Sequence, residues 1–401
     1  MDNFQNYNAK VNAFGARFTI TNYMPGFPPF IPVRREMGEG YVIGFGDNRL
    51  PIAIKDLTRN TVILGEGGVG KTTCIANFGV TNSLLLKFIM MDAVKNDFRH
   101  LLRHLNNVRV YSYELRTIRD NLLEAPTGVS DNEWDSIFSD VFSQQLQMVS
   151  GAGSYQYLYN ALRELKNMAR PRIPALRDLY EYIKTKKEPP FSENYRYRER
   201  ILPRLAALIE DLGESIDCSR GFRCEDMQDP NYHEVIELPY KPDTSSLISD
   251  LFLFRNLKYR MKLTPENRGK TLCYVVDEAK RSFGVHKARA RYSGSMDNLS
   301  ILISTGREFG QAFIISDQDK DSLHPIIPSL CDTFVKFHTN ADSTFKIGRI
   351  MGLTNEQISW LSEKGLRVGQ AVIKTGNFPP VLLNVPNFIF RKDVRDEEIR
   401  L

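Results

Sequence analysis

The sequence predicts an α/β protein whose core is a mostly parallel sheet flanked by helices. Two observations favour this fold class. Short apolar runs typical of buried strands alternate along the chain with stretches of helical periodicity. One of these runs ends in a glycine-rich loop, and a helical stretch follows that loop directly. Buried strands are expected at TVILG (61–65), LLLKFIMMD (84–92), VRVYSY (108–113), TLCYVVDEA (271–279), QAFIISD (311–317), TFVKFH (333–338) and GQAVIKT (369–375).

Local composition divides the chain into five segments. Residues 1–48 are rich in Pro, Gly and aromatic residues, and we expect a short N-terminal β-type element there. The α/β core follows in two parts, at 49–113 and 236–388. Between them, residues 114–235 carry four amphipathic stretches separated by Pro and Gly breaks, which predict a helical insertion. Residues 389–401 form a charged C-terminal tail that we expect to be solvated.

The overall composition excludes several classes of protein. The 401 residues carry 53 Lys+Arg against 48 Asp+Glu, and the net charge of +5 neither requires nor excludes a nucleic-acid partner. The five cysteines form no CxxC pair, so a disulfide scaffold is not expected. The N-terminus lacks the pattern of a signal peptide, and no apolar run reaches the roughly 18 residues of a membrane span. We therefore expect a cytoplasmic protein with no integral membrane segment.

The glycine-rich loop GEGGVGKT, at 65–72, matches GxxxxGK[ST], the phosphate-binding P-loop. Its glycines permit a backbone whose N–H groups converge on an anion, and the N-terminus of the next helix adds to this attraction. In this motif Lys71 reaches the β- and γ-phosphates, and the hydroxyl of Thr72 holds Mg²⁺. The predicted ligands are ATP and Mg²⁺. The residues expected to bind the nucleotide are Gly65, Gly67, Gly68, Val69, Gly70, Lys71, Thr72 and Thr73.

Three classes of protein share the letters GGVGKTT: partitioning ATPases of the ParA/MinD type, signalling switches of the NB-ARC type, and motor ATPases. The ParA/MinD type places a second lysine where this chain has Glu66. NB-ARC switches carry an acidic pair closer to the loop, followed by a winged-helix region for which the sequence shows no pattern. The motor class therefore fits best.

An acidic pair, Asp277 and Glu278, follows the apolar run LCYVV. A carboxylate at the end of a buried strand is suited to holding Mg²⁺, and the next carboxylate is suited to polarising the water that attacks the γ-phosphate. We expect Asp277 to share the metal with Thr72 and Glu278 to be catalytic, together with Lys71. The adjacent pair favours hydrolysis over a slow switch.

With these motifs in order, roughly residues 40 to 388 resemble the HerA/FtsK superfamily of DNA-pumping ATPases, which includes the conjugation and type IV secretion ATPases. The resemblance implies a RecA-like core that assembles as a ring, expected to be a hexamer, and that moves double-stranded DNA. Besides the acidic pair, the segments that carry it are GFGDNRLPIAIKDLTRNTVILGEGGVGKTT, FIMMDAVKNDFRHLL, RDLYEYIK, STGREFGQAFIISDQ and IMGLTNEQISWLSEKGLRVGQAVIKTGNFPPVLLNVP.

The resemblance also implies roles for single residues. Gln318 would sense the γ-phosphate, and Arg307 would be an arginine finger that reaches the site of the neighbouring subunit. Asp92 would help to position the water or the metal, or it would be a strand-terminal turn residue. The chain departs from the family at Asp317, where Ser or Thr is usual, and in an N-terminal stretch shorter than the family's β-barrel.

Basic and aromatic residues are interleaved in KRSFGVHKARARYSG, directly after the acidic pair. Such a loop would line the central pore of a ring and hold DNA phosphates, or it would be a solvated basic loop. The residues expected to contact DNA are Lys280, Arg281, Lys287, Arg289 and Arg291.

Two other functions stay open at this point. A secretion or conjugation ATPase would drive the export of protein or nucleoprotein, and a nucleotide-gated signalling module would bind ATP with negligible turnover. The resemblance also allows a nuclease or another protein as a partner.

Overall fold

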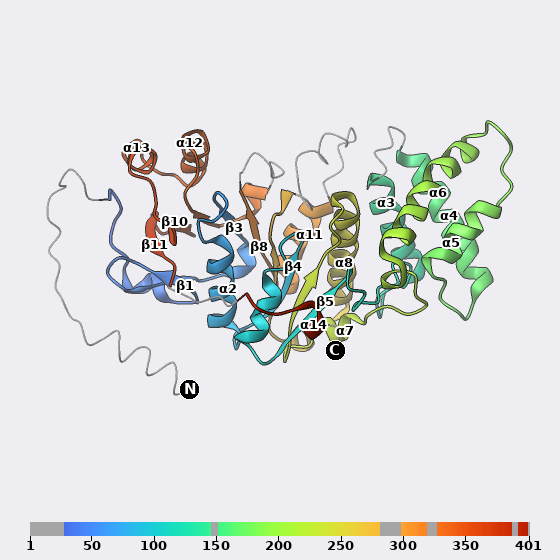
Figure 1. Ribbon diagram of the computed structural model, residues 1–401, viewed down its shortest axis with the longest axis horizontal. Helices are drawn as coiled ribbons and strands as arrows, with labels where there is room; N and C mark the ends of the chain where they lie inside the picture. Colours follow the sequence, from blue (N-terminus) through green and yellow to red (C-terminus); the bar gives the residue numbers. More distant parts are fainter. Residues whose placement is uncertain (1–27, 146–150, 281–297, 319–326, 387–391, 400–401) are drawn as a thin grey trace.

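An eleven-stranded sheet runs through the part of the chain that the computed structural model describes, residues 28–145, 151–280, 298–318, 327–386 and 392–399 (Figure 1). Parallel neighbours form the order β5-β6-β4-β7-β8-β3-β9, and the antiparallel strands β10, β11, β1 and β2 extend the sheet beyond β9. The predicted mostly parallel α/β fold is confirmed. The strands are β1 (Tyr41–Phe45), β2 (Pro51–Ile54), β3 (Thr61–Leu64), β4 (Leu86–Asp92), β5 (Val108–Ser112), β6 (His233–Glu237), β7 (Thr271–Val276), β8 (Gln311–Asp317), β9 (Thr333–Lys336), β10 (Gln370–Thr375) and β11 (Val381–Asn384).

Helices cover both faces of the sheet. Along β4, Phe88 and Met90 belong to one buried cluster, and Ile89 and Met91 belong to another. This alternation between two apolar faces is typical of a parallel sheet between helical layers. Helix α2 packs on the first face, and α8 and α11 pack on the second. The α-helices are α2 (Lys71–Asn82), α3 (Asp131–Gln145), α4 (Gly151–Ala169), α5 (Leu176–Thr185), α6 (Glu193–Leu212), α7 (Cys224–Met227), α8 (Pro242–Lys262), α11 (Asn298–Gly306), α12 (Ala341–Ile350), α13 (Asn355–Glu363) and α14 (Asp396–Ile399).

The carboxyl ends of the parallel strands meet at one edge of the sheet, which is uppermost in Figure 1. Strand β8 lies between β3 and β7, with Leu64 opposite Asp317 and Val276 opposite Ile315. Strand β4 lies on the other side of β7. The segments that follow β3, β8, β7 and β4 are therefore neighbours at this edge, which is where open α/β sheets bind ligands.

Helices α3, α4, α5 and α6 follow β5 in the chain and lie at the end of the molecule far from β1 (Figure 1). These helices match the four amphipathic stretches of the sequence. Helix α3 packs against both α4 and α8, and α8 in turn covers one face of the sheet. The inserted helices are thereby joined to the core through α8.

Strand β6 is an element that the hydrophobic pattern did not predict, and it crosses the predicted segment boundary at 235. Its sequence, HEVIE, is fully buried although three of its five residues are polar. Glu234 is buried as the partner of Lys87 on β4, with 2.9 Å between Nζ and Oε1. The polar side chains pair inside the sheet, so the apolar alternation that identifies a strand is lost.

Strand β10 corrects one expectation, because it was grouped with the parallel strands and instead pairs antiparallel with β9. Helices α12 and α13 lie at the carboxyl edge of the sheet (Figure 1), so the chain re-enters the sheet from the edge at which β9 ended. On the far side, β1 and β2 pair as one antiparallel hairpin, and the predicted boundary at 48 falls within it.

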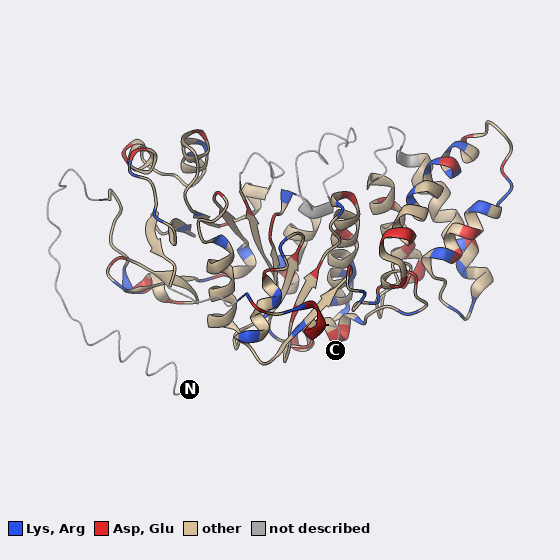
Figure 2. Cartoon of the chain, in the orientation of Figure 1, with Lys and Arg blue, Asp and Glu red and all other residues tan. Residues whose placement is uncertain are grey.

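The described part of the C-terminal tail, 392–399, packs against the core, although six of its eight residues stay exposed as a solvated tail predicts. It lies against the 3₁₀ helix η3 (Phe98–Arg103), where α14 is an acidic helix next to basic residues (Figure 2). Arg103 binds Asp393 at 2.9 Å and Glu398 at 2.7 Å. Arg99 is buried between Asp396 and Glu237. The alternating charges of the tail match the arginines of η3, which explains why it packs.

Within the described residues, every helix is too short or too polar to cross a membrane. All five cysteines lie in the described residues, where they are buried and unpaired.

A buried ion pair fixes the start of the helical insertion and generates a prediction. Asp120 and Arg255 of α8 form a pair in which the side chains are 1% and 3% exposed, and Tyr113 also donates to Asp120. We expect Asp120→Ala to lower the free energy of unfolding by about 3–5 kcal/mol, because it leaves the guanidinium buried without its counter-charge. Urea denaturation followed by circular dichroism measures this loss.

The matched control is Glu214→Ala, which removes the partner of Arg119 from a pair that is 60% and 70% exposed. This change should cost no more than about 1 kcal/mol. Equal losses for the two variants would contradict the prediction.

Candidate nucleotide-binding and hydrolysis site

The P-loop is held in place by the two strands that flank β3. The amide of Gly65 donates to the carbonyl of Asp317, at 3.3 Å, and the amide of Glu66 donates to the carbonyl of His338, at 3.0 Å. A Cβ atom on Gly65 would lie 2.6 Å from Cβ of Phe337, so only glycine fits where the loop leaves the sheet. The beginning of the loop is thus fixed by backbone contacts.

The middle of the loop is open to a ligand. Gly68 and Gly70 have φ of +79° and +108°, a left-handed conformation that glycine adopts without strain. Added Cβ atoms at Gly67 and Gly68 would meet no atom within 4 Å, so a ligand can approach this backbone closely. Gly70 is the N-cap of α2, and the first-turn N–H groups of that helix favour an anion. Val69 is buried, and Thr72 and Thr73 are half-buried in the first turn.

Lys71 lies inside its own loop. Its Nζ donates to the carbonyls of Gly65 and Glu66, at 2.5 and 2.8 Å. Burial lowers the pKa of Lys71, and the nearby carboxylates of Asp277 and Asp317 oppose this shift. The ammonium therefore lies between the P-loop and the acidic pair, at the position that the motif requires.

Asp277 is a buried carboxylate at the end of β7, 6% exposed. It accepts a hydrogen bond from Ser316 Oγ of β8 at 2.7 Å, and burial raises its pKa. A buried carboxylate with a raised pKa is stabilised by a bound cation. Carboxylate and hydroxyl oxygens suit Mg²⁺, so Asp277 and Thr72 fit the metal that the motif implies.

Glu278 has a left-handed backbone, with φ of +50°, and its side chain is 13% exposed. Its Oε1 lies 3.1 Å from Nζ of Lys95, which belongs to the segment after β4. A non-glycine residue in this conformation is strained, and such strain is found more often at functional sites than elsewhere.

Asp317 and Gln318 end β8, between the P-loop and the acidic pair. Asp317 is 1% exposed and accepts from the amides of Gln318 and Lys280, at 2.6 and 2.5 Å. The Asp317 carboxylate thereby joins the segments that follow β8 and β7. Gln318 is exposed at this edge, as its expected role requires.

Asp92 is 3% exposed and accepts from three amides of its own loop: Val94 at 3.2 Å, Lys95 at 3.1 Å and Phe98 at 3.3 Å. These bonds agree with the second of the two roles considered for Asp92, that of a turn residue at the end of a strand. Its charge also raises the pKa of Asp277, so the carboxylate lies near the site. A direct part in catalysis stays a prediction.

Arg307 lies at the opposite edge of the sheet. It precedes β8, and Asp317 at the other end of that strand is the neighbour of the P-loop. Seven residues of strand span roughly 20 Å. The Arg307 side chain is 52% exposed and lies 3.8 Å from Asp56. It therefore does not reach the P-loop of its own chain.

The basic loop is described at Lys280 alone, where the side chain is exposed. The other four DNA-binding candidates, Arg281, Lys287, Arg289 and Arg291, lie outside the described residues.

Two polar residues near the site had no role in the sequence prediction. Ser316 donates a hydrogen bond to Asp277. In the sequence, its hydroxyl within an otherwise apolar strand was the one feature that could have pointed to a role. Lys336 on β9 is 1% exposed and pairs with Leu64 in register. Burial lowers the pKa of Lys336 to about 8, although the negative charge of Glu66 acts to raise it. The presence of a lysine in the apolar run TFVKFH could have identified Lys336 from the sequence.

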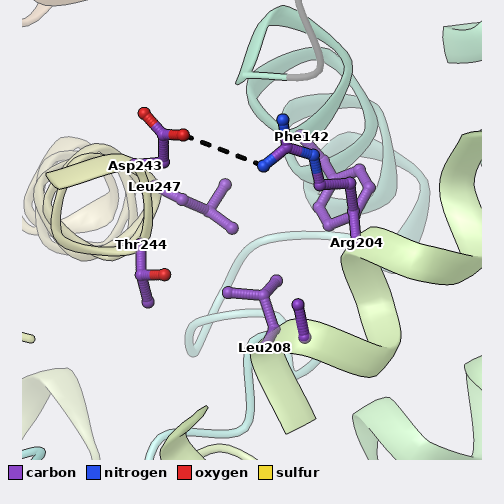
Figure 3. Close-up of a pocket in the computed structure, with 7 residues that line it drawn as sticks. Phe142, Arg204, Leu208, Asp243, Thr244 and Leu247 are labelled. Carbon is purple, nitrogen blue, oxygen red and sulfur yellow. Dashed lines mark ion pairs between the residues drawn. The ribbon is translucent and has the colours of Figure 1, made fainter. Parts of the chain in front are cut away.

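A separate cleft lies between the helical insertion and α8, away from the P-loop (Figure 3). Arg204 of α6 reaches across it to Asp243 of α8, with 3.8 Å between Nη1 and Oδ2. Both side chains are more than half exposed, so this pair contributes little stability. Phe142, Leu208 and Leu247 form the apolar part of the lining.

The fold and the site together define a RecA-like P-loop protein. Two solved structures are similar over nearly their whole length. VirB4 of Thermoanaerobacter pseudethanolicus matches with a TM-score of 0.66 and 17% identity, covering 88% of this chain and 98% of that chain. The bacterial conjugative coupling protein TrwB matches with a TM-score of 0.67 and 12% identity, covering 92% and 98%. No protein-family model and no curated protein matches the sequence. The predicted RecA-like core is confirmed.

The loop geometry predicts different outcomes for two neighbouring glycines. Gly65→Ala should lower the free energy of unfolding by about 1–3 kcal/mol, because the new methyl group overlaps Phe337. Gly67→Ala places its methyl group in open space and should change stability by less than about 0.5 kcal/mol. Thermal unfolding of both variants without nucleotide measures the difference. A Gly67→Ala loss as large as that of Gly65→Ala would refute this account of the loop.

Proposed function

We propose that this protein is an ATP-driven motor of the HerA/FtsK type, which forms a ring and moves double-stranded DNA. The observation that carries the proposal is that the P-loop follows β3 and the Asp277–Glu278 pair follows β7, with β8 alone between these two strands. The charges of Asp277 and Glu278 act on Lys71 in this arrangement. A P-loop lysine and an Asp-Glu pair at one edge of the sheet provide the parts that ATP hydrolysis needs.

The ligands of a similar structure support Mg·ATP as the substrate. TrwB has been solved in complex with ADP and Mg²⁺, and also with non-hydrolysable ATP and GTP analogues. In this chain the P-loop amides and Lys71 would bind the phosphates, and Thr72 and Asp277 would hold Mg²⁺. Glu278 would polarise the attacking water, and Gln318 would sense the γ-phosphate.

Arg307 supports assembly into a ring, for which we propose a hexamer. Because Arg307 lies at the edge of the sheet away from its own P-loop, it can act in hydrolysis only at the site of another copy. A guanidinium there would match the charge that develops on the transferring phosphoryl group. Lys280 and the basic residues after it would face DNA in the pore. The proposal includes a cytoplasmic location and a nuclease or another protein as partner.

One observation favours a second function. The similarity to TrwB and VirB4 is also what a conjugation or secretion ATPase would show. Such an enzyme would act on a nucleoprotein or protein substrate, and free duplex DNA would not stimulate it. A signalling module is less favoured, because Glu278 is present beside Asp277.

Steady-state ATP hydrolysis with and without linear duplex DNA tests the proposal. We expect several-fold stimulation by duplex DNA in the wild-type protein, and no hydrolysis above background in Lys71→Ala. Glu278→Gln should lower kcat about 10²–10⁴-fold while ATP stays bound, since it removes the group that polarises water. Hydrolysis indifferent to DNA would favour the secretion ATPase, and no hydrolysis would favour the signalling module.

A mixing experiment tests the arginine finger. Lys71→Ala and Arg307→Ala should each be inactive alone, because each lacks one half of every site. Mixed in equal amounts, they should regain activity, since about a quarter of the interfaces then combine an intact P-loop with an intact finger. No recovery, in a mixture shown to co-assemble, would contradict action between subunits.

A further inference from the structure

Lys95 is a second lysine at the candidate nucleotide site. The amide of Lys95 donates to Asp92 at 3.1 Å, and the next residue, Asn96, has φ of +52°. Asp92 binds two further amides of this loop, so its backbone is tied to the end of β4. The side chain of Lys95 is 46% exposed, in contrast to the fixed backbone beneath it. The ammonium is therefore the partly exposed end of a side chain whose backbone is fixed.

The ammonium of Lys95 lies among the groups of the hydrolysis site. It is 3.1 Å from Oε1 of Glu278. Burial alone would lower the pKa of Lys95, but the hydrogen bond and charge of Glu278, with the charge of Asp277, raise it. The charge of Lys95 also adds to the effect of burial in lowering the pKa of Lys71. Lys95 is thus protonated and lies near both Lys71 and the acidic pair.

An ammonium bound to Glu278 opposes the role of that carboxylate. A carboxylate that polarises water needs a free oxygen and its full negative charge. The bond to Lys95 occupies one oxygen of Glu278 and offsets its charge. A γ-phosphate bound at Lys71 would be a strong competing acceptor for the same ammonium, because charge-assisted bonds to phosphate are strong.

We infer that Lys95 is a positioning residue that discriminates triphosphate from diphosphate: it holds Glu278 until a γ-phosphate is bound, and then binds that phosphate. This inference rests on the proposed nucleotide site but on neither DNA nor a ring. It makes the release of Glu278 depend on a bound γ-phosphate.

Nucleotide affinity, measured by calorimetry in Mg²⁺ with ADP and a non-hydrolysable ATP analogue, tests the inference without any turnover. Lys95→Met should weaken binding of the analogue about tenfold and change ADP binding less than about twofold. Lys95→Arg keeps the cation and should stay close to the wild type. Lys55→Met, which removes an exposed lysine after β2, controls for loss of positive charge. Retained ADP binding shows that each variant is folded.

A double-mutant cycle tests the competition between Glu278 and the phosphate. Glu278→Gln removes the negative charge that holds Lys95 and should strengthen analogue binding several-fold, and this gain should vanish in the Lys95→Met background. Equal weakening of both nucleotides by Lys95→Met, or an unchanged gain in the double variant, would overturn the inference. A wild-type protein that binds neither nucleotide would overturn the proposed function too, whereas absent stimulation by DNA would count against the motor alone.

Discussion

The register of the parallel strands is the constraint on which the candidate site depends. Hydrogen bonding sets Leu64 of β3 against Asp317 of β8, and Ile315 of β8 against Val276 of β7. The P-loop and the acidic pair therefore leave the sheet as neighbours, although the whole helical insertion separates them in the chain. A slip of one residue would turn every side chain of a strand to the other face. Both faces are buried, so the packing specifies this register strongly.

Buried carboxylates fix the loops that follow these strands. Asp317 accepts amides from the segments after β8 and β7, and Asp92 accepts three amides of the segment after β4. A buried carboxylate is costly unless such donors satisfy it. These amide donors fix the position of each carboxylate, and each carboxylate in turn fixes the loop that carries the donors. The side chains of Lys95 and Gln318 project from backbones that these bonds fix.

Much of the core could be predicted from local sequence, because the conformation of an apolar run or a glycine-rich loop is determined largely by its own residues. The P-loop, β7 with its acidic pair, and the four inserted helices are of this kind. Strand β6 could not be predicted, since Glu234 is buried only through Lys87, far away in the chain. The same holds for Ser316, whose role depends on Asp277, and for the place of Arg307, which depends on the strand order. The packing of the tail could not be predicted either, because it depends on the arginines of η3, far away in the chain.

The ion pairs of the tail also bear on the order in which the molecule is completed during synthesis. Arg99 and Arg103 are joined to acidic residues 290 to 297 positions further along the chain. A ribosome makes the arginines long before their partners, and folding begins with the earlier segments. The support beneath the Lys95 loop is thus assembled in two stages. A nascent chain in which the parallel strands, the last of which ends at Lys336, have paired still lacks these contacts until residues 392–399 have emerged.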